Sequence, residues 1–433
     1  MSIDVEQREL GFETLQIHAG QVPDATTSAR ALPIYQTTSF VFDSGEHAAG
    51  IFDLSIDDHA YSRVSNPTLQ AVEARLAALD GGSAALLTSS GQSAVTLTLL
   101  ALARHGDHIV ASASLYGGTV TLLEHTFADF GIEVTFVSDP DDLEAWRDAV
   151  RPNTRAFFGE TIGNPKGNVL DVPGVAKVAH AAGVPLVVDN TVLTPYLLRP
   201  LEHGADVVVY SATKFLAWHG TSIAGAIVDG GRFDFGLERE KWPRLVNPDP
   251  SYHGISFWDR FAPDGVAFIA YVRSRLLRDL GPSLSPLNAF LLAQGLETLS
   301  LRMERHVANA TQIAYWLADN HFVASVAYPN LVTSPWHRRA RLLLPRGAGA
   351  VLSFEVKGGY DTAVRVVDGL QLFSHLANIG DVRSLVIHPA STTHAQLTPV
   401  QLAASGVSPS LIRLSIGLEG LDDLIADLDQ ALA

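Results

Sequence analysis

The sequence predicts an α/β protein that combines a large, mostly parallel sheet with a smaller C-terminal α/β domain. Near-continuous apolar segments of strand length recur along the chain, and segments with helical periodicity separate them. No internal repeat or low-complexity segment interrupts this alternation. Apolar strands separated by helices are typical of parallel sheets whose two faces are covered. The length of 433 residues, at about 150 residues per domain, indicates two or three structural units.

The first 60 residues show weak periodicity and many small polar side chains, which predicts an irregular arm that packs on something else. We expect a large domain over residues 61–283, up to the turn at Gly281-Pro282, and a small domain over residues 284–433. The segment Gly230–Gly265 is rich in Pro, Gly, Asp and aromatic residues, and we interpret it as a long ordered loop or a substrate lid.

Within the large domain, periodicity predicts alternating strands and helices. The strands are expected at His108–Ala111, Glu133–Val137, Arg155–Phe158, Pro185–Asp189, Asp206–Tyr210 and Ile223–Val228. The helices are expected at Gln92–Ala103, Gly118–Phe130 and Val172–Ala182. In the small domain we expect a helix over Pro286–Asn320, a strand at Val351–Val356, a helix near Tyr360–Gln371 and a strand at Leu411–Ile416.

Composition excludes several kinds of function. The formal charge of −16 disfavours binding to nucleic acid and to anionic membrane surfaces. Cysteine is absent, so disulfides, thiolate nucleophiles and cysteine metal sites are excluded. The 16 histidines form no HExxH motif or compact ligand cluster, and we expect no metal. The first ten residues are unlike a secretory signal and no apolar run reaches membrane-spanning length, so we expect a cytoplasmic protein.

Two residues at strand ends suggest chemistry on a cofactor ring. Lys214 follows an apolar strand, and in a partly desolvated pocket a lysine has a lowered pKa, so its neutral amine can form a Schiff base and transfer protons. Asp189 ends another buried strand, where ligands of open α/β sheets bind, and it can pair with a pyridinium nitrogen. The alternatives are a solvated surface lysine and an aspartate that caps the next turn.

Several polar residues are candidates for binding a phosphate. Free N–H groups and the dipole at a helix N-terminus favour an anion, although an ordinary helix cap has the same sequence. Hydroxyl, phenol and guanidinium groups add donors, although each could be an ordinary surface residue. The candidates are Ser90, Gly91 and Gln92 before a predicted helix, Ser211 and Thr213 beside Lys214, and Tyr61 and Arg63.

Two further residues are candidates for contacting a cofactor or substrate. Tyr116 stands between a predicted strand and helix, where its ring could stack on a planar cofactor or simply pack in the core. Arg413 lies within an apolar strand, which is costly unless a carboxylate pairs with it. That carboxylate could belong to a buried acidic side chain or to a substrate.

Six motifs, in this order, resemble the Cys/Met-metabolism family of fold-type-I pyridoxal-phosphate enzymes, which have the aspartate aminotransferase-like fold. The resemblance runs from about Thr14 to the carboxyl terminus. The motifs are Tyr-Ser-Arg-Val-Ser-Asn-Pro-Thr68, Ser-Gly-Gln92, Leu-Tyr-Gly-Gly-Thr119, Glu160-Thr-Ile-Gly-Asn-Pro165, Val-Asp-Asn-Thr191 and Ser-Ala-Thr-Lys214.

The resemblance implies a role for each candidate. Lys214 would form the Schiff base with pyridoxal 5′-phosphate, with Asp189 facing the ring nitrogen, Asn164 near the phenolic oxygen and Tyr116 stacked on the ring. Lys214 and Tyr116 would be the catalytic residues. Gly91, Gln92, Ser211 and Thr213, with the neighbouring Ser90, would hold the phosphate. Tyr61 and Arg63 would reach the phosphate of a neighbouring subunit's site, which implies a homo-oligomer, expected to be a tetramer built as a dimer of dimers. Ser384 and Arg413 match positions that hold the substrate α-carboxylate.

Within the family, four further segments are similar to the O-acetylhomoserine sulfhydrylase group. They are Asp249-Pro-Ser-Tyr-His-Gly254, Leu287-Asn-Ala-Phe-Leu-Leu-Ala-Gln-Gly-Leu-Glu-Thr298, Asn378-Ile-Gly-Asp-Val-Arg-Ser-Leu385 and His388-Pro-Ala-Ser-Thr-Thr-His394. The resemblance implies γ-replacement in methionine biosynthesis, with O-acetylhomoserine and sulfide, or methanethiol, as substrates. Trp218 and the segment Ile223-Ala-Gly-Ala226 depart from the group's pattern, and Trp218 could reshape the pocket mouth.

Three alternatives stay open. A γ-lyase acting on methionine or cystathionine shares the early steps, although methionine γ-lyases usually carry a cysteine where this chain has Gly118. A cystathionine γ-synthase would use the same site with another leaving group or nucleophile. A catalytically silent protein of the same fold is disfavoured because Lys214, Asp189, Tyr116 and Arg413 are all retained.

Overall fold

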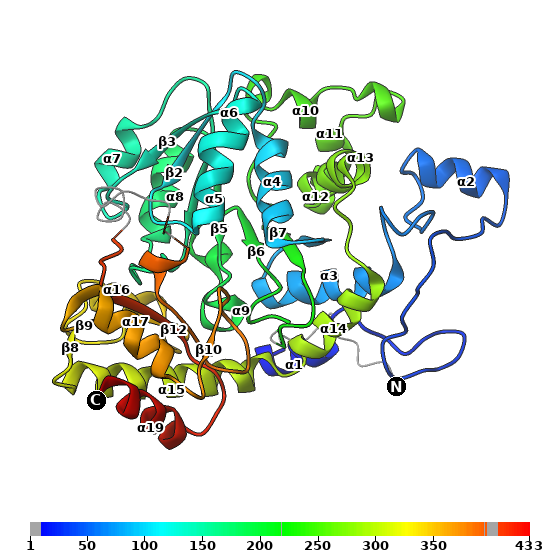
Figure 1. Ribbon diagram of the computed structural model, residues 1–433. Coiled ribbons are helices and arrows are strands. Elements are labelled where there is room, and N and C mark those ends of the chain that lie inside the picture. The colour runs from blue at the N-terminus through cyan, green and yellow to red at the C-terminus, as the bar shows by residue number, and fades with distance from the viewer. Residues whose placement is uncertain (1–9, 218, 394, 396–405) are drawn as a thin grey trace.

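The computed structural model describes residues 10–217, 219–393, 395 and 406–433. Two sheets organise these residues, and the smaller sheet, built from residues 323–415, lies at the lower left of Figure 1, below the large sheet. The seven-stranded sheet has the order β1-β7-β6-β5-β4-β2-β3, and the five-stranded sheet has the order β10-β11-β12-β9-β8. The predicted α/β class with a second, smaller sheet domain is therefore confirmed. The limits predicted for the three domains stay predictions.

The large sheet is parallel across five strands and antiparallel at one edge. Its strands are β1 Ala84–Thr88, β2 His108–Ser112, β3 Glu133–Val137, β4 Thr154–Glu160, β5 Leu186–Asp189, β6 Val207–Tyr210 and β7 Gly225–Asp229. Strands β6, β5, β4, β2 and β3 run parallel, and β7 pairs antiparallel with β6 and β1. All six predicted strands are present, and β1 is an additional one.

In β1, β6 and β7, alternating side chains belong to two different hydrophobic cores. Val208 and Tyr210 of β6 pack with α3, α9, α14 and α15, whereas Val207 and Val209 pack with α4, α8 and α12. These helices are α3 Pro67–Asp80, α4 Gly91–Leu102, α8 Val172–Ala181, α9 Thr194–Leu197, α12 Ala267–Tyr271, α14 Pro286–Leu296 and α15 Leu299–Asp319. Burial on both faces explains the nearly continuous apolar strands.

The remaining helices of the large sheet region are short. The predicted helix Gly118–Phe130 is continuous in space and comprises α5 Gly117–Thr121, the π-helical turn η2 Leu122–Thr126 and α6 Phe127–Asp129. Helix α7 covers Leu143–Asp148, and a π-helical segment η7, Val272–Leu277, joins α12 to α13, Arg278–Leu280. The short 3₁₀ turn η3 covers Pro200–His203.

The predicted single helix over Pro286–Asn320 is wrong, because α14 ends at Leu296 and α15 begins at Leu299. Thr298 leaves the helical region with ψ near 16°. The buried Arg302 of α15 donates to the carbonyl oxygens of Gly295 and Phe215, at 2.5 and 2.8 Å. The carbonyl groups in the last turn of a helix have no N–H partner within that helix. The Arg302 guanidinium supplies the donor that the Gly295 carbonyl would otherwise lack, so α14 can end here.

The smaller sheet is largely antiparallel. Its strands are β8 Val323–Ala327, β9 Val351–Val356, β10 Ser374–His375, β11 Leu385–Ile387 and β12 Leu411–Ser415, of which β8, β10 and β11 were not predicted. Its helices are α16 His337–Leu343, α17 Gly359–Gly369, α19 Leu421–Leu432 and the 3₁₀ turn η8 Pro389–Ser391. The predicted strands Val351–Val356 and Leu411–Ile416 pair with each other as β9 and β12.

The described part of the N-terminal arm contains two short helices rather than irregular chain alone. Helix α1, Phe12–His18, packs on α3 and α15, and α2, Gly45–Phe52, projects away from the sheets in Figure 1. Segment Gly230–Gly265 is ordered, as predicted, with η4 Arg239–Lys241, α10 Pro243–Val246, η5 Pro250–Tyr252, α11 Phe257–Phe261 and η6 Ala262–Asp264. Among the described helices, none is long and apolar enough to cross a membrane.

Candidate active site

A cavity of about 320 Å³ opens where the carboxyl ends of β4, β5 and β6 meet the smaller sheet. Parallel strands end at the same edge of a sheet, so residues distant in sequence meet there. Ten of the predicted residues line it, namely Ser90, Gly91, Gln92, Tyr116, Asn164, Asp189, Ser211, Thr213, Lys214 and Arg413. No residue of Gly230–Gly265 lines this cavity, and aromatic side chains of the segment pack into the core of the large sheet. The alternative of a substrate lid stays a prediction.

Lys214 projects into the cavity from the loop after β6. Its Nζ donates a hydrogen bond to Oδ1 of Asn378. Burial, and next the positive charge of Arg413, lower the pKa of Lys214 to about 8. A substantial fraction of the amine is therefore neutral near pH 8, which is the form that attacks a carbonyl or accepts a proton.

Two carboxyl groups end neighbouring strands of the sheet, the buried Glu160 on β4 and the half-buried Asp189 on β5. Burial raises the pKa of Asp189, against the hydrogen bonds from Thr191, whose N–H donates to Asp189 Oδ1 at 2.9 Å. Burial and the nearby Asp189 raise the pKa of Glu160 well above its usual range. A cationic ring nitrogen in the cavity would favour the ionised form of Asp189.

Helix α4 begins at the cavity with a tightly built N-terminus. The Ser90 hydroxyl caps the helix by accepting from the Ser93 N–H at 3.1 Å. A Cβ on Gly91 would lie 2.7 Å from Cα of Ser211, so only glycine fits there. Ser211 donates its N–H to the Thr191 hydroxyl at 2.8 Å, which fixes the second wall. The two walls form a cradle in which helix N–H groups and hydroxyls suit a phosphate.

Tyr116 and Asn164 face the same cavity. The Tyr116 side chain is 55% exposed, and its backbone N–H donates to Glu160 Oε1 at 2.6 Å, so its ring is placed over the cavity by a buried carboxyl group. The Oδ1 atom of Asn164 is buried with no hydrogen-bond partner in the described structure. A buried unpartnered amide oxygen is costly, and it indicates that a polar ligand atom completes the site.

Arg413 reaches the cavity from β12 of the smaller sheet. Its Nη2 donates to the backbone oxygen of Asn378 at 3.1 Å. Burial lowers the pKa of Arg413 to about 10, and no carboxylate of the described residues forms an ion pair with it. A desolvated guanidinium without an internal counter-ion leaves its donors for the carboxylate of a ligand.

Asn378 was not among the candidates from the sequence, although it contacts both cationic side chains. It lies in the loop between β10 and β11, with Oδ1 toward Lys214 and its carbonyl oxygen toward Arg413. Asn378 begins one of the four segments that are similar to the O-acetylhomoserine sulfhydrylase group, but asparagine in a loop carries no distinctive spacing that would assign it a role. Glu160 was quoted within a motif but not selected. Other lining residues that were missed are Thr119, Thr161, Ile162, Thr191, Val192, Ile223, Ala377, Ile379 and Thr393.

Three predicted residues lie outside this cavity. Ser384 is fully buried, and its hydroxyl donates to Glu419 at 2.9 Å and accepts from the Gly417 N–H at 2.8 Å, so this hydroxyl is engaged within the protein and does not line the cavity. Tyr61 and Arg63 line a separate cavity of about 790 Å³ between the N-terminal arm and residues 261–278. The two cavities share no described lining residue. Trp218 lies outside the described residues.

The site defines a pyridoxal-phosphate enzyme. One cavity is surrounded by a lysine with a lowered pKa, a half-buried carboxyl group for a ring nitrogen, an unpartnered amide oxygen and a phosphate cradle. These groups fit the cofactor's aldehyde, ring and phosphate. No group of three or more His, Asp or Glu side chains among the described residues could hold a metal ion.

The chain belongs to the Cys/Met metabolism PLP-dependent enzyme family, whose model matches residues 13–433. It is 52% identical to an O-acetyl-L-homoserine sulfhydrylase of Leptospira meyeri, over 97% of this chain and 96% of the relative. It is 50% identical to a homocysteine synthase of Schizosaccharomyces pombe, over 97% and 98% of the two chains.

A solved structure agrees with this assignment. A Campylobacter jejuni protein described as a candidate O-acetylhomoserine (thiol)-lyase superposes with a TM-score of 0.94 at 40% identity, covering 98% of this chain and all of the other. That crystal structure contains N′-pyridoxyl-lysine-5′-monophosphate. The family, the fold and the dependence on pyridoxal phosphate predicted from the motifs are confirmed.

Proposed function

We propose that this enzyme catalyses γ-replacement, in which O-acetylhomoserine and sulfide give homocysteine and acetate in methionine biosynthesis. The observation that carries this proposal is the pairing in one cavity of a lysine amine of lowered pKa with a half-buried arginine that has no ion pair to a carboxylate of the described residues. The first group suits proton transfer on an amino acid, and the second suits its carboxylate. The names of relatives at about 50% identity over the full length support the substrate.

Bound pyridoxal phosphate supplies an electron sink for negative charge at the α carbon of the substrate. Lys214 acts as the general base that removes the α proton and then assists loss of a β proton. The γ carbon–oxygen bond breaks, acetate leaves, and sulfide forms a new γ carbon–sulfur bond before the protons return. The hydrogen bond to Asn378 holds the Lys214 amine toward the substrate side of the cavity.

Other residues bind and orient. Arg413 binds the α-carboxylate together with the Asn378 side chain, and this assignment replaces the one expected for the Ser384 hydroxyl. Lys214 would hold the cofactor covalently until the substrate amine displaces it and frees the lysine amine to act as base. Asp189 would pair with the ring nitrogen, Asn164 would lie near the phenolic oxygen and Tyr116 would cover the ring. The phosphate is held by Ser90, Gly91, Gln92, Ser211 and Thr213.

The proposed assembly is a homotetramer, a dimer of dimers, in the cytoplasm. Tyr61 and Arg63 stand in a cavity separate from that of Lys214, so they are available to a neighbouring subunit's site rather than their own. The Arg63 guanidinium lies 5.2 Å from the centroid of the Tyr61 ring, which keeps the two side chains together. Sedimentation at working concentration would test the tetramer.

The experiment that tests the activity mixes purified holoenzyme with O-acetylhomoserine and sulfide and assays homocysteine beside 2-oxobutyrate and ammonia. Homocysteine as the main product, lost in Lys214→Ala, is the expected result. Chiefly 2-oxobutyrate and ammonia would identify a γ-lyase, and turnover only with cysteine would identify a cystathionine γ-synthase. Parallel assays with O-succinylhomoserine and methanethiol determine the leaving group and the nucleophile. No turnover with any substrate would indicate a silent protein.

A further inference from the structure

The turn that carries Tyr61 and Arg63 is held by an arginine from a segment about 200 residues later in the chain. The turn closes with the Val64 N–H donating to the Tyr61 carbonyl at 2.9 Å. Nη1 of Arg273, in the π-helical segment η7, donates to the carbonyl oxygen of Val64 at 3.0 Å. Arg273 therefore contacts the backbone directly after Arg63.

The same guanidinium is tied to the frame of the large sheet. Nη2 of Arg273 forms an ion pair with Oε2 of Glu73, on α3, at 2.7 Å. Glu73 is buried, and its other oxygen accepts the Leu87 N–H of β1 at 2.9 Å. Strand β1 ends at Thr88, two residues before Ser90. The ion pair between Arg273 and Glu73 therefore connects two parts of the chain. One is strand β1, which leads to the phosphate cradle of this subunit, and the other is the turn Tyr61–Val64, which is proposed to serve a neighbouring subunit.

We propose that Arg273 is a positioning residue for the cofactor phosphate, acting through the turn Tyr61–Val64. This inference rests on the proposed role of Tyr61 and Arg63 at a neighbouring subunit's site. The hydrogen-bond partners of Arg273 among the described residues are Val64 and Glu73, and neither of them lines the Lys214 cavity. Its effect on the phosphate is therefore transmitted by the position of Arg63.

The geometry requires an arginine. Two separate nitrogen atoms of a rigid planar fork meet two different acceptors, a carbonyl oxygen and a carboxylate. A lysine ammonium is a single point charge, which would follow the buried carboxylate of Glu73 and release the Val64 carbonyl. Arg273→Lys therefore keeps the buried ion pair and selectively loosens the turn.

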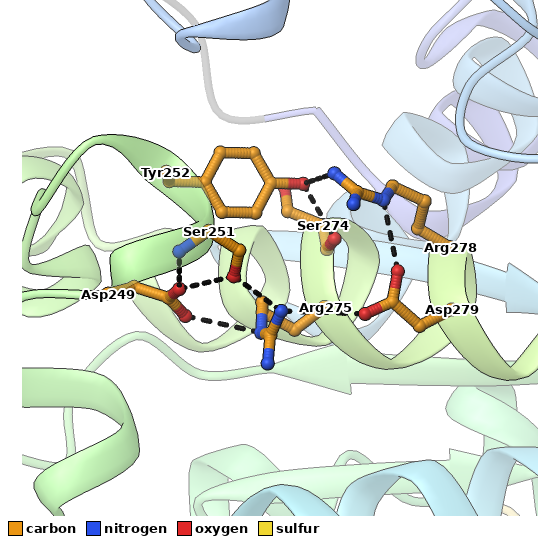
Figure 2. A network of polar contacts seen from close by, with 7 residues as sticks. All are labelled: Asp249, Ser251, Tyr252, Ser274, Arg275, Arg278 and Asp279. Carbon is orange, nitrogen blue, oxygen red and sulfur yellow. Dashed lines mark hydrogen bonds and ion pairs between the residues drawn. The ribbon is translucent and has the colours of Figure 1, made fainter.

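Arg275 offers a matched control on the same helical segment. Figure 2 shows that Arg275 and Arg278 point toward the segment Asp249–Tyr252. Arg275 Nε lies 3.2 Å from Asp249 Oδ2 and its Nη1 donates to the Ser251 hydroxyl at 2.5 Å, while Arg278 donates to the Tyr252 phenol at 2.7 Å. Arg275→Lys breaks a comparable forked contact two residues away, without touching the turn Tyr61–Val64.

The test is a double-mutant cycle on cofactor retention. Holoenzymes of the wild type, Arg63→Ala, Arg273→Lys, the double variant and Arg275→Lys are diluted stepwise, and the bound fraction of pyridoxal phosphate is read from its visible absorbance. We expect Arg63→Ala and Arg273→Lys each to raise the apparent dissociation constant about tenfold. Arg275→Lys should stay within about twofold, and Arg273→Lys should add less than about twofold to Arg63→Ala.

Each outcome bears on the inference. Equal retention of pyridoxal phosphate by Arg273→Lys and Arg275→Lys would overturn the inference. A tenfold effect of Arg273→Lys that persists in the Arg63→Ala background would also overturn it, because the effects of two independent substitutions on the binding free energy add. Unchanged retention by Arg63→Ala alone would instead show that the proposed role of the turn is wrong. If Arg273→Lys does not fold, the variant Glu73→Gln/Arg273→Met leaves no buried charge unpaired and should give the same non-additivity.

Discussion

Lys214 and Asn378 meet across the cavity, where Nζ of the lysine donates a hydrogen bond to Oδ1 of the asparagine. The contact joins a loop of the large sheet to a loop of the smaller sheet. It favours the charged form of a lysine whose pKa is otherwise lowered, chiefly by burial, to about 8. Asn378 thus bears on the protonation of the base as well as on its position.

Substitutions of Asn378 should move the pH dependence in opposite directions. In Asn378→Ala the ammonium form loses an acceptor, so the pKa of Lys214 falls and the acidic limb of the kcat profile shifts to lower pH. In Asn378→Asp a carboxylate raises the pKa of Lys214 and moves the limb to higher pH, while it also repels the substrate carboxylate. We expect a rise in KM of about a hundredfold for Asn378→Asp. Limbs that coincide with wild type in both variants would contradict this reading.

Gly91→Ala should impair the phosphate cradle. A Cβ there would lie 2.7 Å from both Cα and Cβ of Ser211, so the wall carrying Ser211 must move. We expect pyridoxal phosphate to be retained at least about tenfold less tightly, with dilution and visible absorbance as the measurement. Gly117→Ala is the control, because a Cβ at Gly117 meets nothing within 4 Å. Similar retention by the two alanine variants would show that the close approach does not shape the phosphate site.

Arg413→Lys should weaken substrate binding and leave cofactor binding intact. Arg413 is half-buried without an ion pair to a carboxylate of the described residues, and a lysine cannot reproduce its forked recognition of a carboxylate. We expect KM for O-acetylhomoserine to rise about a hundredfold, by steady-state kinetics, with the visible cofactor spectrum unchanged. A KM near the wild-type value combined with loss of the cofactor would place Arg413 at the cofactor instead.

Periodicity and strand-end residues predicted much of this structure. The six predicted strands of the large sheet are buried on both faces, so their apolar runs are distinctive, and ten candidate residues converge because parallel strands end together. Strands β8, β10 and β11 were missed because the first is half-exposed and the others have only two or three residues. Such short segments lack a readable period.

The errors in the site have a similar origin. Ser384 and Asn378 lie six residues apart in one loop region, and the sequence does not show which of them turns toward the cavity. The structure places Ser384 against Glu419 and Asn378 against Lys214. The helix break at Thr298 depends on Arg302 reaching back to Gly295, a tertiary contact that periodicity does not reveal.

His306 should make the protein sensitive to acid. This histidine on α15 is fully buried, its Nδ1–H donates to the Ile416 carbonyl at 2.7 Å, and burial lowers its pKa from 6.5 to about 4. Between pH 6.5 and pH 4 the His306 side chain binds more protons in the unfolded chain than in the folded protein. Its contribution to the free energy of unfolding is therefore fully present above pH 6.5 and is lost as the pH falls toward 4. At pH 5 this group alone should cost about 2 kcal/mol of the free energy of unfolding.

His306→Asn keeps an N–H donor but cannot titrate. Between pH 7 and pH 5 the free energy of unfolding of this variant should fall by about 2 kcal/mol less than that of wild type, whatever the substitution costs at pH 7. Urea denaturation at matched protein concentration measures both values. His125→Asn is the control, because the His125 side chain is 69% exposed and should leave the pH slope unchanged. Equal slopes for wild type and His306→Asn would mean that His306 is charged in the folded protein or that another buried group dominates its acid lability.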